Sequence, residues 1–421
     1  MAAVAARPQR RWFRLIAVLS LLLAACSSAE SSATTQETTT TSSATSPDTS
    51  TVSETTAEPD SEQVGQIGAD SWSTFRGDAQ RRAVVGESSI PLEEPELLWQ
   101  FQTGGVVESS PAVVGGTVFA GTFDDNLFAI DAETGEERWA FPVGGLVRAS
   151  PAVVDGRVFF GADDNLFYAV DAETGAELWR FELGGGGEQS SPAVVDGVVY
   201  FGGFDRFVYA LDAETGSEIW RFETGNGILS SPLVVDGLVY IGSIDGVFYA
   251  LDIATGAEQW TVQTGNSIFS SGALIPAADG PEGRAAIAFG SDDGRVYAVD
   301  AEIGELLWTV QTNRSVFATP AVADGEVLVG SRDGLFFSIR AASGEALWAT
   351  DLTEVLSSAA VDAERIYVGS SDGTLHILDR ANGASITQLP VGDLVWTSPA
   401  VVDGHLFFGA HDGNIHAYRV G

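Results

Sequence analysis

The chain has 421 residues, and 58 acidic against 21 basic side chains give it a formal net charge of −37 at pH 7. All of its basic residues are Arg. Nucleic acids and anionic lipid surfaces bind clustered cations, so this composition argues against both as partners. A hydrophobic fraction of 45% with 48 Gly and 10 Trp supplies a large core and many turns, which excludes a chain disordered throughout. The acidic surface suits a salty medium or reflects a biased genome.

The first 25 residues have the pattern of an export signal. Several Arg side chains come first, an apolar run from Leu15 to Ala25 follows, and small residues end it. The run is too short to span a bilayer, which takes about 20 residues. Arg10 and Arg11 resemble a twin-arginine signal, although basic leaders of the general export route are often rich in Arg as well.

Cys26 is the only cysteine, which excludes an intramolecular disulfide, an all-cysteine zinc site and a redox pair. Residues 23–26, Leu-Ala-Ala-Cys, resemble the lipobox of bacterial lipoproteins. The resemblance implies lipidation of Cys26, with the domain anchored to the membrane on its extracytoplasmic side; the alternative is a chance Cys after an ordinary signal peptide. Residues 26–64 are rich in Ser and Thr and are predicted to form a flexible tether.

A sequence repeat governs the chain after residue 97. Aligning the dipeptide Ser-Pro and its variants gives eight copies at intervals of 39 to 41 residues, with one interval of 48. The anchors are Pro111, Pro151, Pro192, Pro232, Gly272, Pro320, Ala359 and Pro399. A period near 40 residues with four β segments per copy indicates the blade of a β-propeller. The long interval predicts a surface insertion from Pro276 to Ala285.

The third copy shows the pattern within one blade. Residues 191–195, 198–202, 207–211 and 219–222 are rich in β-branched and aromatic side chains, and Asp-Gly or Thr-Gly turns separate them. The last copy ends after its third strand, and an unmatched fourth strand, 97–101, precedes the first copy. We therefore predict an all-β fold: an eight-bladed β-propeller of four-stranded blades whose N-terminal strand closes the last blade and removes the open sheet edges.

A tryptophan recurs in the outermost strand with the same period. The series is Trp99, Trp139, Trp179, Trp220, Trp260, Trp308 and Trp348, and Thr387 takes the eighth place. With the motif Ala-x-Asp-x-x-Thr-Gly-x-x-x-Trp of residues 210–220, residues 97–421 resemble the PQQ-like (quinoprotein-type) propeller repeat. The resemblance implies that the Trp side chains dock between neighbouring blades. Residues 72–78 are similar to a segment that often precedes this propeller, so residues 65–96 are expected to pack on it.

One end of the predicted propeller is nearly the same in every blade. It carries the Asp-Gly turns and the Asp-Ala-Glu-Thr-Gly turns, whose Asp side chains suit turn-capping hydrogen bonds better than metal binding. These residues are Asp131, Asp171, Asp212, Asp252 and Asp300.

The opposite end varies from blade to blade. Three residues before each anchor, the column is Glu108, Arg148, Gln189, Leu229, Phe269, Phe317, Leu356 and Trp396. Because alternate residues of a strand point to the same side, we expect this column, and the Ser or Thr that directly precedes each anchor, at the mouth of the axial channel. The column is a candidate binding site; the alternative is that it only plugs the channel.

Hairpin residues surround the same mouth and form either a protein-binding rim or ordinary turns. They are Phe123, Asp163, Phe204, Ile244, Asp292, Arg332, Ser371 and His411. All four His residues, His376, His405, His411 and His416, fall in the last two copies without the spacing of metal ligands, so no metal site is predicted.

The lipobox, the blade number and the length together resemble the BamB family of propeller lipoproteins of the outer-membrane β-barrel assembly machinery. This resemblance implies a lipid-anchored binding propeller, without enzymatic activity or cofactor, whose partner is a cell-envelope protein. The repeat also occurs in quinoprotein dehydrogenases, which implies a PQQ- and calcium-dependent enzyme as the alternative. Such enzymes commonly pack a vicinal disulfide on the cofactor, and this chain has only Cys26. A propeller that senses a small molecule is the third hypothesis.

Overall fold

The computed structural model describes residues 72–75, 77, 94–187 and 190–420. The chain divides into two units, Met1–Gln63 and Val64–Gly421, and all described residues belong to the second. The predicted signal peptide, Cys26, the tether and Gln189 lie outside the described residues, as does most of the predicted leader segment. Within the described part, no helix combines the length and the hydropathy needed to cross a membrane.

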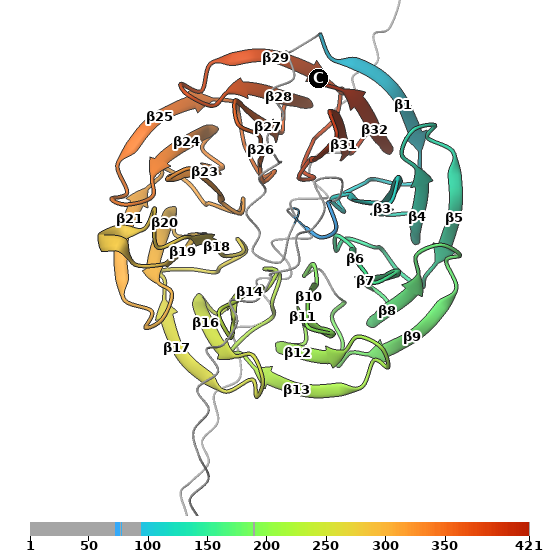
Figure 1. The fold of residues 1–421 in the computed structure, drawn as a ribbon, viewed down its shortest axis with the longest axis horizontal. Helices are drawn as coiled ribbons and strands as arrows, with labels where there is room; N and C mark the ends of the chain where they lie inside the picture. The colour runs from blue at the N-terminus through green and yellow to red at the C-terminus, as the bar shows by residue number, and fades with distance from the viewer. Residues whose placement is uncertain (1–71, 76, 78–93, 188–189, 421) are drawn as a thin grey trace, which may run out of the picture. The chain divides into compact units, whose positions relative to one another are not determined.

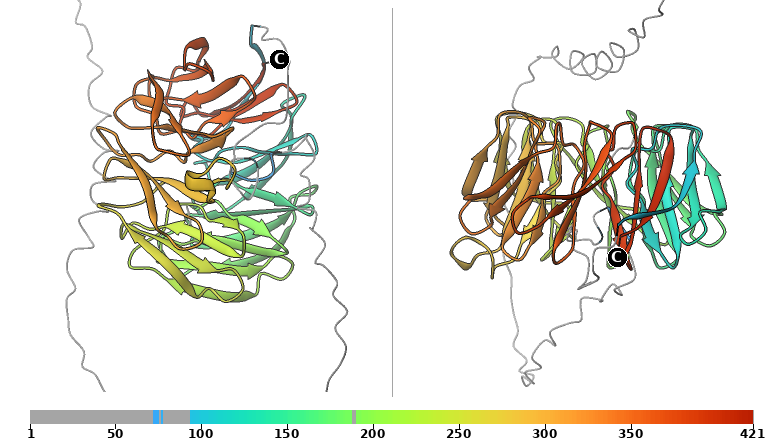
Figure 2. Two further views of the ribbon diagram at one scale, coloured as in Figure 1. Left: turned by 60° about the vertical axis from the view of Figure 1, so that its left-hand side comes forward. Right: turned by 90° about the horizontal axis from the view of Figure 1, so that it is seen from above.

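The described residues form eight four-stranded antiparallel sheets arranged as blades around a central axis (Figure 1). This confirms the predicted eight-bladed β-propeller. Blades 1 to 7 each take four consecutive strands from the innermost outward, starting with β2 in blade 1. Blade 8 has the order β30-β31-β32-β1 and so combines both ends of the propeller sequence. The blades stand side by side as a flat ring when seen edge-on (Figure 2).

The strands are short, as expected for small twisted blades. The innermost strands are β2 (Ala112–Val114), β6 (Ala152–Val154), β10 (Ala193–Val195), β14 (Leu233–Val235), β18 (Ala273–Ile275), β22 (Ala321–Ala323), β26 (Ala360–Val361) and β30 (Ala400–Val402). The second strands are β3 (Thr117–Gly121), β7 (Arg157–Ala162), β11 (Val198–Gly202), β15 (Leu238–Gly242), β19 (Ala286–Ser291), β23 (Glu326–Gly330), β27 (Arg365–Gly369) and β31 (His405–Gly409).

The third strands of blades 1 to 7 end at the Asp-Ala-Glu-Thr-Gly turns or their variants, and that of blade 8 is the last strand in chain order. They are β4 (Asn126–Asp131), β8 (Leu166–Asp171), β12 (Phe207–Asp212), β16 (Val247–Asp252), β20 (Arg295–Asp300), β24 (Leu335–Arg340), β28 (Thr374–Asp379) and β32 (Asn414–Arg419). The outermost strands are β1 (Glu96–Gln102), β5 (Glu137–Pro142), β9 (Glu177–Glu182), β13 (Glu218–Glu223), β17 (Glu258–Gln263), β21 (Leu306–Gln311), β25 (Ala346–Asp351) and β29 (Ser385–Pro390). The insertion predicted in blade 5 contains a short 3₁₀ helix, η1 (Pro281–Gly283).

The docking tryptophans join each blade to the next. In six of the seven positions within the described residues, the indole N–H donates to a backbone carbonyl of the following blade, as from Trp220 to Ile253 at 3.0 Å. The ring lies against the glycine of the neighbouring turn, where a Cβ on Gly256 would lie 2.6 Å from Trp220 Cε3. Trp348 packs against Gly383 in the same way.

This geometry explains why Thr387 stands in the eighth position. An outermost-strand Trp of blade 7 would need a turn between the third and fourth strands of blade 8. Those strands are β32 and β1, which come from opposite ends of the propeller and have no connecting turn. Among the described residues no turn accepts a Trp from blade 7, which accounts for the Thr at this position.

A closed ring of hydrogen bonds links all eight blades near the axis. The residue before each anchor donates its backbone N–H to the hydroxyl of its counterpart in the next blade, for example Ser231 to Ser271 at 2.8 Å, and Ser398 returns to Ser110 at 2.9 Å. These hydroxyls are buried. The Ser and Thr column that was predicted for the channel mouth thus forms buried contacts between blades.

The described part of the leader adds to the innermost strands. Trp72 and Val113 exchange both backbone hydrogen bonds, at 2.7 and 2.8 Å, and Val153 donates to the carbonyl of Ser73 at 2.7 Å. Trp72 is buried within a hydrophobic core whose other members come from blades 1, 6, 7 and 8. This short segment therefore covers otherwise free edge groups of β2 and β6.

Candidate functional site

The predicted binding column and the predicted hairpin rim meet at one end of the channel, which we call the mouth face. In most blades the hairpin residue donates its N–H to the carbonyl two residues before the column residue, as from Asp163 to Leu146 at 2.9 Å. All seven described column residues are half-buried, and each follows a fully buried Val or Ile, for example Val147 before Arg148. The repeat therefore positions one variable pair of side chains per blade.

Five side chains from blades 8, 1 and 2 form a continuous series that we call the polar arc. Arg148 Nε lies 3.0 Å from Asp163 Oδ2, and Arg148 Nη1 lies 3.1 Å from Glu108 Oε2. Glu108 Oε1 lies 3.4 Å from His411 Nε2, and the rings of His411 and Trp396 meet edge to face with centroids 4.6 Å apart. The sequence placed all five on the variable end, but it gave no sign that they contact one another.

The polar arc contains one more carboxylate than guanidinium, so its net charge is slightly negative. Two carboxylates, Glu108 and Asp163, face one guanidinium, which also lies over the ring of Phe123 with its Cζ 4.4 Å from the centroid. Burial raises the pKa of Asp163 above its ordinary value, and the Arg148 hydrogen bond opposes that shift. The guanidinium is therefore already neutralised by its neighbours.

Blades 5 and 6 carry a different surface, the aromatic patch of Phe269, Phe317 and Arg332. The two phenyl rings meet edge to face with centroids 4.7 Å apart, and Arg332 Cζ lies 5.0 Å from the Phe317 centroid. Arg332 also forms an ion pair with Glu354, a residue that the repeat analysis did not single out. Glu354 lies two residues before Leu356 and outside the columns that were compared, so the alignment of the blades did not identify it.

A shallow polar pocket adjoins the aromatic patch. Its lining includes Asp292, Asn313, Arg314, Ser315 and Arg332. Both oxygens of Asp292 are satisfied, one by the Asn266 amide at 2.9 Å and the other by Ser315. The remaining mouth residues Leu229, Phe204, Ile244 and Leu356 are half-buried apolar side chains.

The turns of the opposite face serve as caps. Asp131 Oδ1 accepts from the backbone N–H groups of Glu133 and Thr134, at 3.0 and 2.9 Å, and the Arg138 guanidinium beside it lowers its pKa to about 2. Asp171, Asp212 and Asp252 have the same arrangement, with the Thr hydroxyl as the main cause of a lowered pKa. Asp300 accepts backbone N–H groups likewise and pairs with Arg284 at 3.0 Å.

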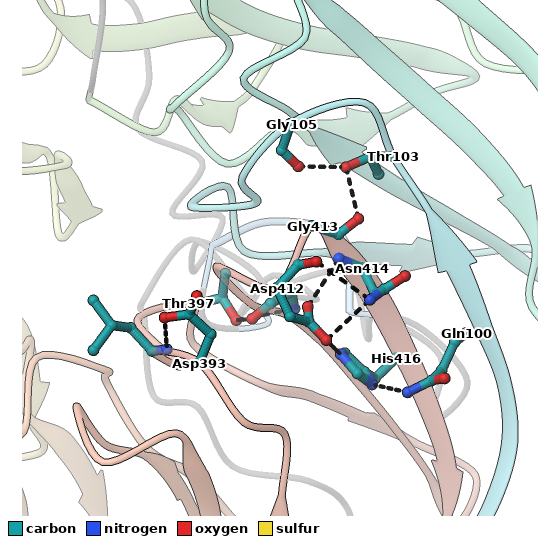
Figure 3. A network of polar contacts seen from close by, with 11 residues as sticks. Gln100, Thr103, Gly105, Asp393, Thr397, Asp412, Gly413, Asn414 and His416 are labelled. Atoms are coloured by element: carbon teal, nitrogen blue, oxygen red, sulfur yellow. Dashed lines mark hydrogen bonds and ion pairs between the residues drawn. The ribbon is translucent and has the colours of Figure 1, made fainter. Parts of the chain in front are cut away.

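Two of the four His residues replace a tyrosine of the repeat. In blades 2 to 5 a Tyr hydroxyl donates to the Asp four residues before it, as from Tyr209 to Asp205 at 2.7 Å. His416 Nε2 lies 3.0 Å from Asp412 Oδ2, and its Nδ1 lies 3.1 Å from the Gln100 amide (Figure 3). His376 occupies the corresponding place in blade 7. Among the described residues, no group of His, Cys, Asp or Glu is suited to a metal ion.

The fold and the variable mouth face define a β-propeller of the PQQ-like class. A family profile described as "Beta-alanine-activating enzyme, beta-propeller" matches residues 88–327, more than half of the chain. The chain belongs to that propeller family. A second profile, described as "Outer membrane protein assembly factor BamB", matches residues 270–421, and the chain resembles BamB. No curated protein sequence matches the chain.

Solved structures share the fold at low sequence identity. BamB from Moraxella catarrhalis is 20% identical with a TM-score of 0.67, covering 78% of this chain and 98% of that one. The quinohemoprotein alcohol dehydrogenase from Comamonas testosteroni is 16% identical with a TM-score of 0.73, covering 83% of this chain and 80% of that one. A europium-containing methanol dehydrogenase is 14% identical with a TM-score of 0.74, covering 84% and 99%. The fold is therefore common to BamB and to alcohol and methanol dehydrogenases.

Proposed function

We propose that this chain is a lipid-anchored, extracytoplasmic binding propeller that presents its mouth face to a protein of the cell envelope. The profile described as an outer membrane protein assembly factor supports an envelope role. The lipobox at residues 23–26 supports export and anchoring through Cys26. The observation that carries the proposal is the aromatic patch, because half-exposed aromatic rings beside an Arg are typical anchors of protein interfaces.

The mouth face suits a binding role better than PQQ-dependent catalysis. The quinone cofactor carries several carboxylates, which need unpaired cations. Arg148 and Arg332 are paired with carboxylates, which leaves the exposed Arg314 of the polar pocket as one cation for several carboxylates. Calcium needs several oxygen ligands together, usually carboxylates among them, and the described residues contain no group of three or more His, Cys, Asp or Glu side chains suited to a metal ion. These residues fit neither group, and we assign no catalytic residue.

The test is crosslinked capture of partners from intact envelopes with the full-length protein. Phe317→Ala combined with Phe269→Ala should lower capture of the main partner at least about tenfold, because interface energy concentrates in such anchors. The matched control is Leu178→Ala, which removes an exposed apolar side chain from the outermost strand of blade 2. Equal capture by the double variant and the wild type would contradict the proposal, provided both melt at the same temperature.

A parallel titration separates the enzyme alternative. Thermal unfolding of the protein is measured with PQQ and calcium, together with dye reduction on simple alcohols and sugars. We expect no ligand-dependent rise in melting temperature. A saturable rise with dye turnover would replace the binding proposal with an enzymatic one.

A further inference from the structure

The mouth face holds an unusual number of polar atoms without partners. Among the described residues, seven buried side-chain nitrogen or oxygen atoms lack a hydrogen bond, and four of them belong to mouth residues. Three of the four, Asp163 Oδ1, Ser371 Oγ and Trp396 Nε1, have no hydrogen-bond partner, and the fourth, His411 Nε2, has only the 3.4 Å contact with Glu108 Oε1. Leaving such an atom unsatisfied costs about 1–3 kcal/mol, so a concentration of them at one surface needs a physical reason.

Equivalent positions elsewhere in the propeller are satisfied. Asp292 occupies the same hairpin position in blade 5 as Asp163 in blade 2, and both of its oxygens accept hydrogen bonds. Trp396 is the only Trp in its column, so no other blade offers the same indole at this position. The missing bonds at the mouth, in blades 7, 8 and 2, therefore do not follow from the repeat.

Three of the four atoms belong to the polar arc itself. Asp163 stands at one end of the series of contacts, while Trp396 and His411 stand at the other. His411 is nearly enclosed, with 8% of its side chain exposed, whereas Glu108, Arg148 and Asp163 remain 19 to 28% exposed. The charged side chains of the arc are therefore partly exposed, whereas its polar atoms without hydrogen bonds are buried.

The donors and acceptors among these atoms indicate the class of ligand that could satisfy them. Asp163 Oδ1 accepts, the indole N–H of Trp396 donates, and a His nitrogen or a Ser hydroxyl does either according to its protonation and rotation. A row of hydroxyl groups, each of which gives and takes a hydrogen bond, satisfies such a mixed set. The aromatic ring of Trp396 supplies an apolar surface beside it.

The charge of the polar arc restricts the class of ligand further. Two carboxylates face the single guanidinium of Arg148, so the arc repels anions and favours neutral or cationic groups. We propose that the polar arc is a saccharide-binding site for an uncharged or amino-substituted sugar of at least two units. This site is distinct from the aromatic patch of the proposed function, so each can fail without the other.

The test uses disaccharides that differ only at one substituent. Cellobiose, chitobiose and N,N′-diacetylchitobiose share one linkage and carry a hydroxyl, an amine and an acetamide at the same carbons; cellobiouronic acid adds a carboxylate. Binding to the full-length protein is measured by calorimetry and by tryptophan fluorescence. We expect saturable binding of at least one of the first three, and weaker or no binding of the acid. Tighter binding of longer oligosaccharides would indicate a polymeric glycan, and equal binding a free sugar.

Two variants and one control connect binding to the arc. Asp163→Asn replaces one carboxylate oxygen with an amide donor, and Trp396→Phe removes the indole N–H together with part of the aromatic surface; each should lower affinity about tenfold. Asp292→Asn alters the satisfied counterpart in blade 5 and should leave affinity unchanged. All three are compared with the wild type for melting temperature.

The proposal is overturned if none of the disaccharides binds at concentrations that reveal millimolar affinity. It is also overturned if the two arc variants bind as tightly as the wild type, or if cellobiouronic acid binds best. Partner capture by the Phe269 and Phe317 variants tests the aromatic patch, so its outcome does not depend on whether the polar arc binds a sugar.

Discussion

The six regular blades and the closure region, blades 7 and 8, solve the same packing problem with different residues. In blades 2 to 5 a Tyr hydroxyl bonds an Asp, and blades 7 and 8 use His376 and His416 instead. In the regular blades a Trp docks on the next blade, and Thr387 ends that series at blade 7. The Tyr–Asp bond is also missing from blades 1 and 6, where Phe128 and Phe337 take the place of the Tyr, but His replaces it only where the chain ends meet.

The closure region adds contacts that the regular blades lack. Arg365, buried in blade 7, donates to the carbonyl of Val420 at 2.9 Å, and Arg419 pairs with Glu96 across the β32–β1 junction at 2.7 Å. Gln100 of β1 reaches His416 of β32. The repeat can therefore depart from its consensus in blades 7 and 8, because dedicated contacts hold the two ends of the propeller sequence together.

Removing a docking Trp should show the largest difference between the two regions. Trp220→Ala deletes a nearly buried indole and its bond to Ile253, and should destabilise the propeller by about 3–5 kcal/mol. Thr387→Ala, at the place without an acceptor turn, should cost less than about 0.5 kcal/mol. Denaturant unfolding of both variants measures this. Equal losses would show that the eighth position also docks.

The central hydroxyl ring should not distinguish the regions, because it passes through both. Ser271→Ala in blade 5 and Ser398→Ala in blade 8 each leave a buried N–H without its acceptor, at a cost of about 1–3 kcal/mol. Exposed Ser385→Ala is the control. A clearly smaller loss for Ser398→Ala would mean that the ring is weaker where the chain ends join.

The fold was predictable from the sequence because its information is repeated eight times. The spacing of the anchors, the Trp series and the unmatched strand at residues 97–101 each indicate the closed propeller. The hydroxyl ring was missed because the strand pattern within one blade contains no information on hydrogen bonds between neighbouring blades.

The candidate site was predictable only as a set of positions. Alignment of the blades identifies Glu108, Arg148 and Trp396 as variable members of one column, since variation stands out against a repeat. Which of them touch depends on side-chain conformations between neighbouring blades. Asp163 and His411 join the arc through such contacts, and no spacing in the sequence encodes them.

Acid should weaken the closure region before the regular blades. Burial lowers the pKa of His416 below its ordinary value despite the opposing effect of Asp412, so the folded protein holds it neutral. The unfolded chain binds a proton below about pH 6.5, so stability is full above that pH and falls as pH drops, by at most about 1.4 kcal/mol per pH unit.

His416→Tyr tests this difference directly. It restores the residue that pairs with Asp in blades 2 to 5 and should flatten the pH dependence of the unfolding free energy between about pH 6.5 and 5. His405→Tyr, at a partly exposed site, serves as the control and should leave the slope unchanged. An unchanged slope for His416→Tyr would assign the acid sensitivity elsewhere.

The smallest expected effect is a gain in stability from restoring the repeat in blade 7. There the turn reads Asp379-Arg380-Ala381-Asn382-Gly383, and Asp379 Oδ1 is buried without a partner. In the regular turns a Thr in the place of Asn382 donates its hydroxyl to that oxygen, as Thr174 does to Asp171 at 2.7 Å.

Asn382→Thr should therefore supply the missing donor and stabilise the protein by about 0.5–1.5 kcal/mol in denaturant unfolding. The reverse change in a regular blade, Thr174→Asn, is the matched control and should cost a similar amount. If Asn382→Thr is neutral while Thr174→Asn destabilises, the closure region tolerates the orphan oxygen because its stability depends on the contacts of the chain ends rather than on its turns.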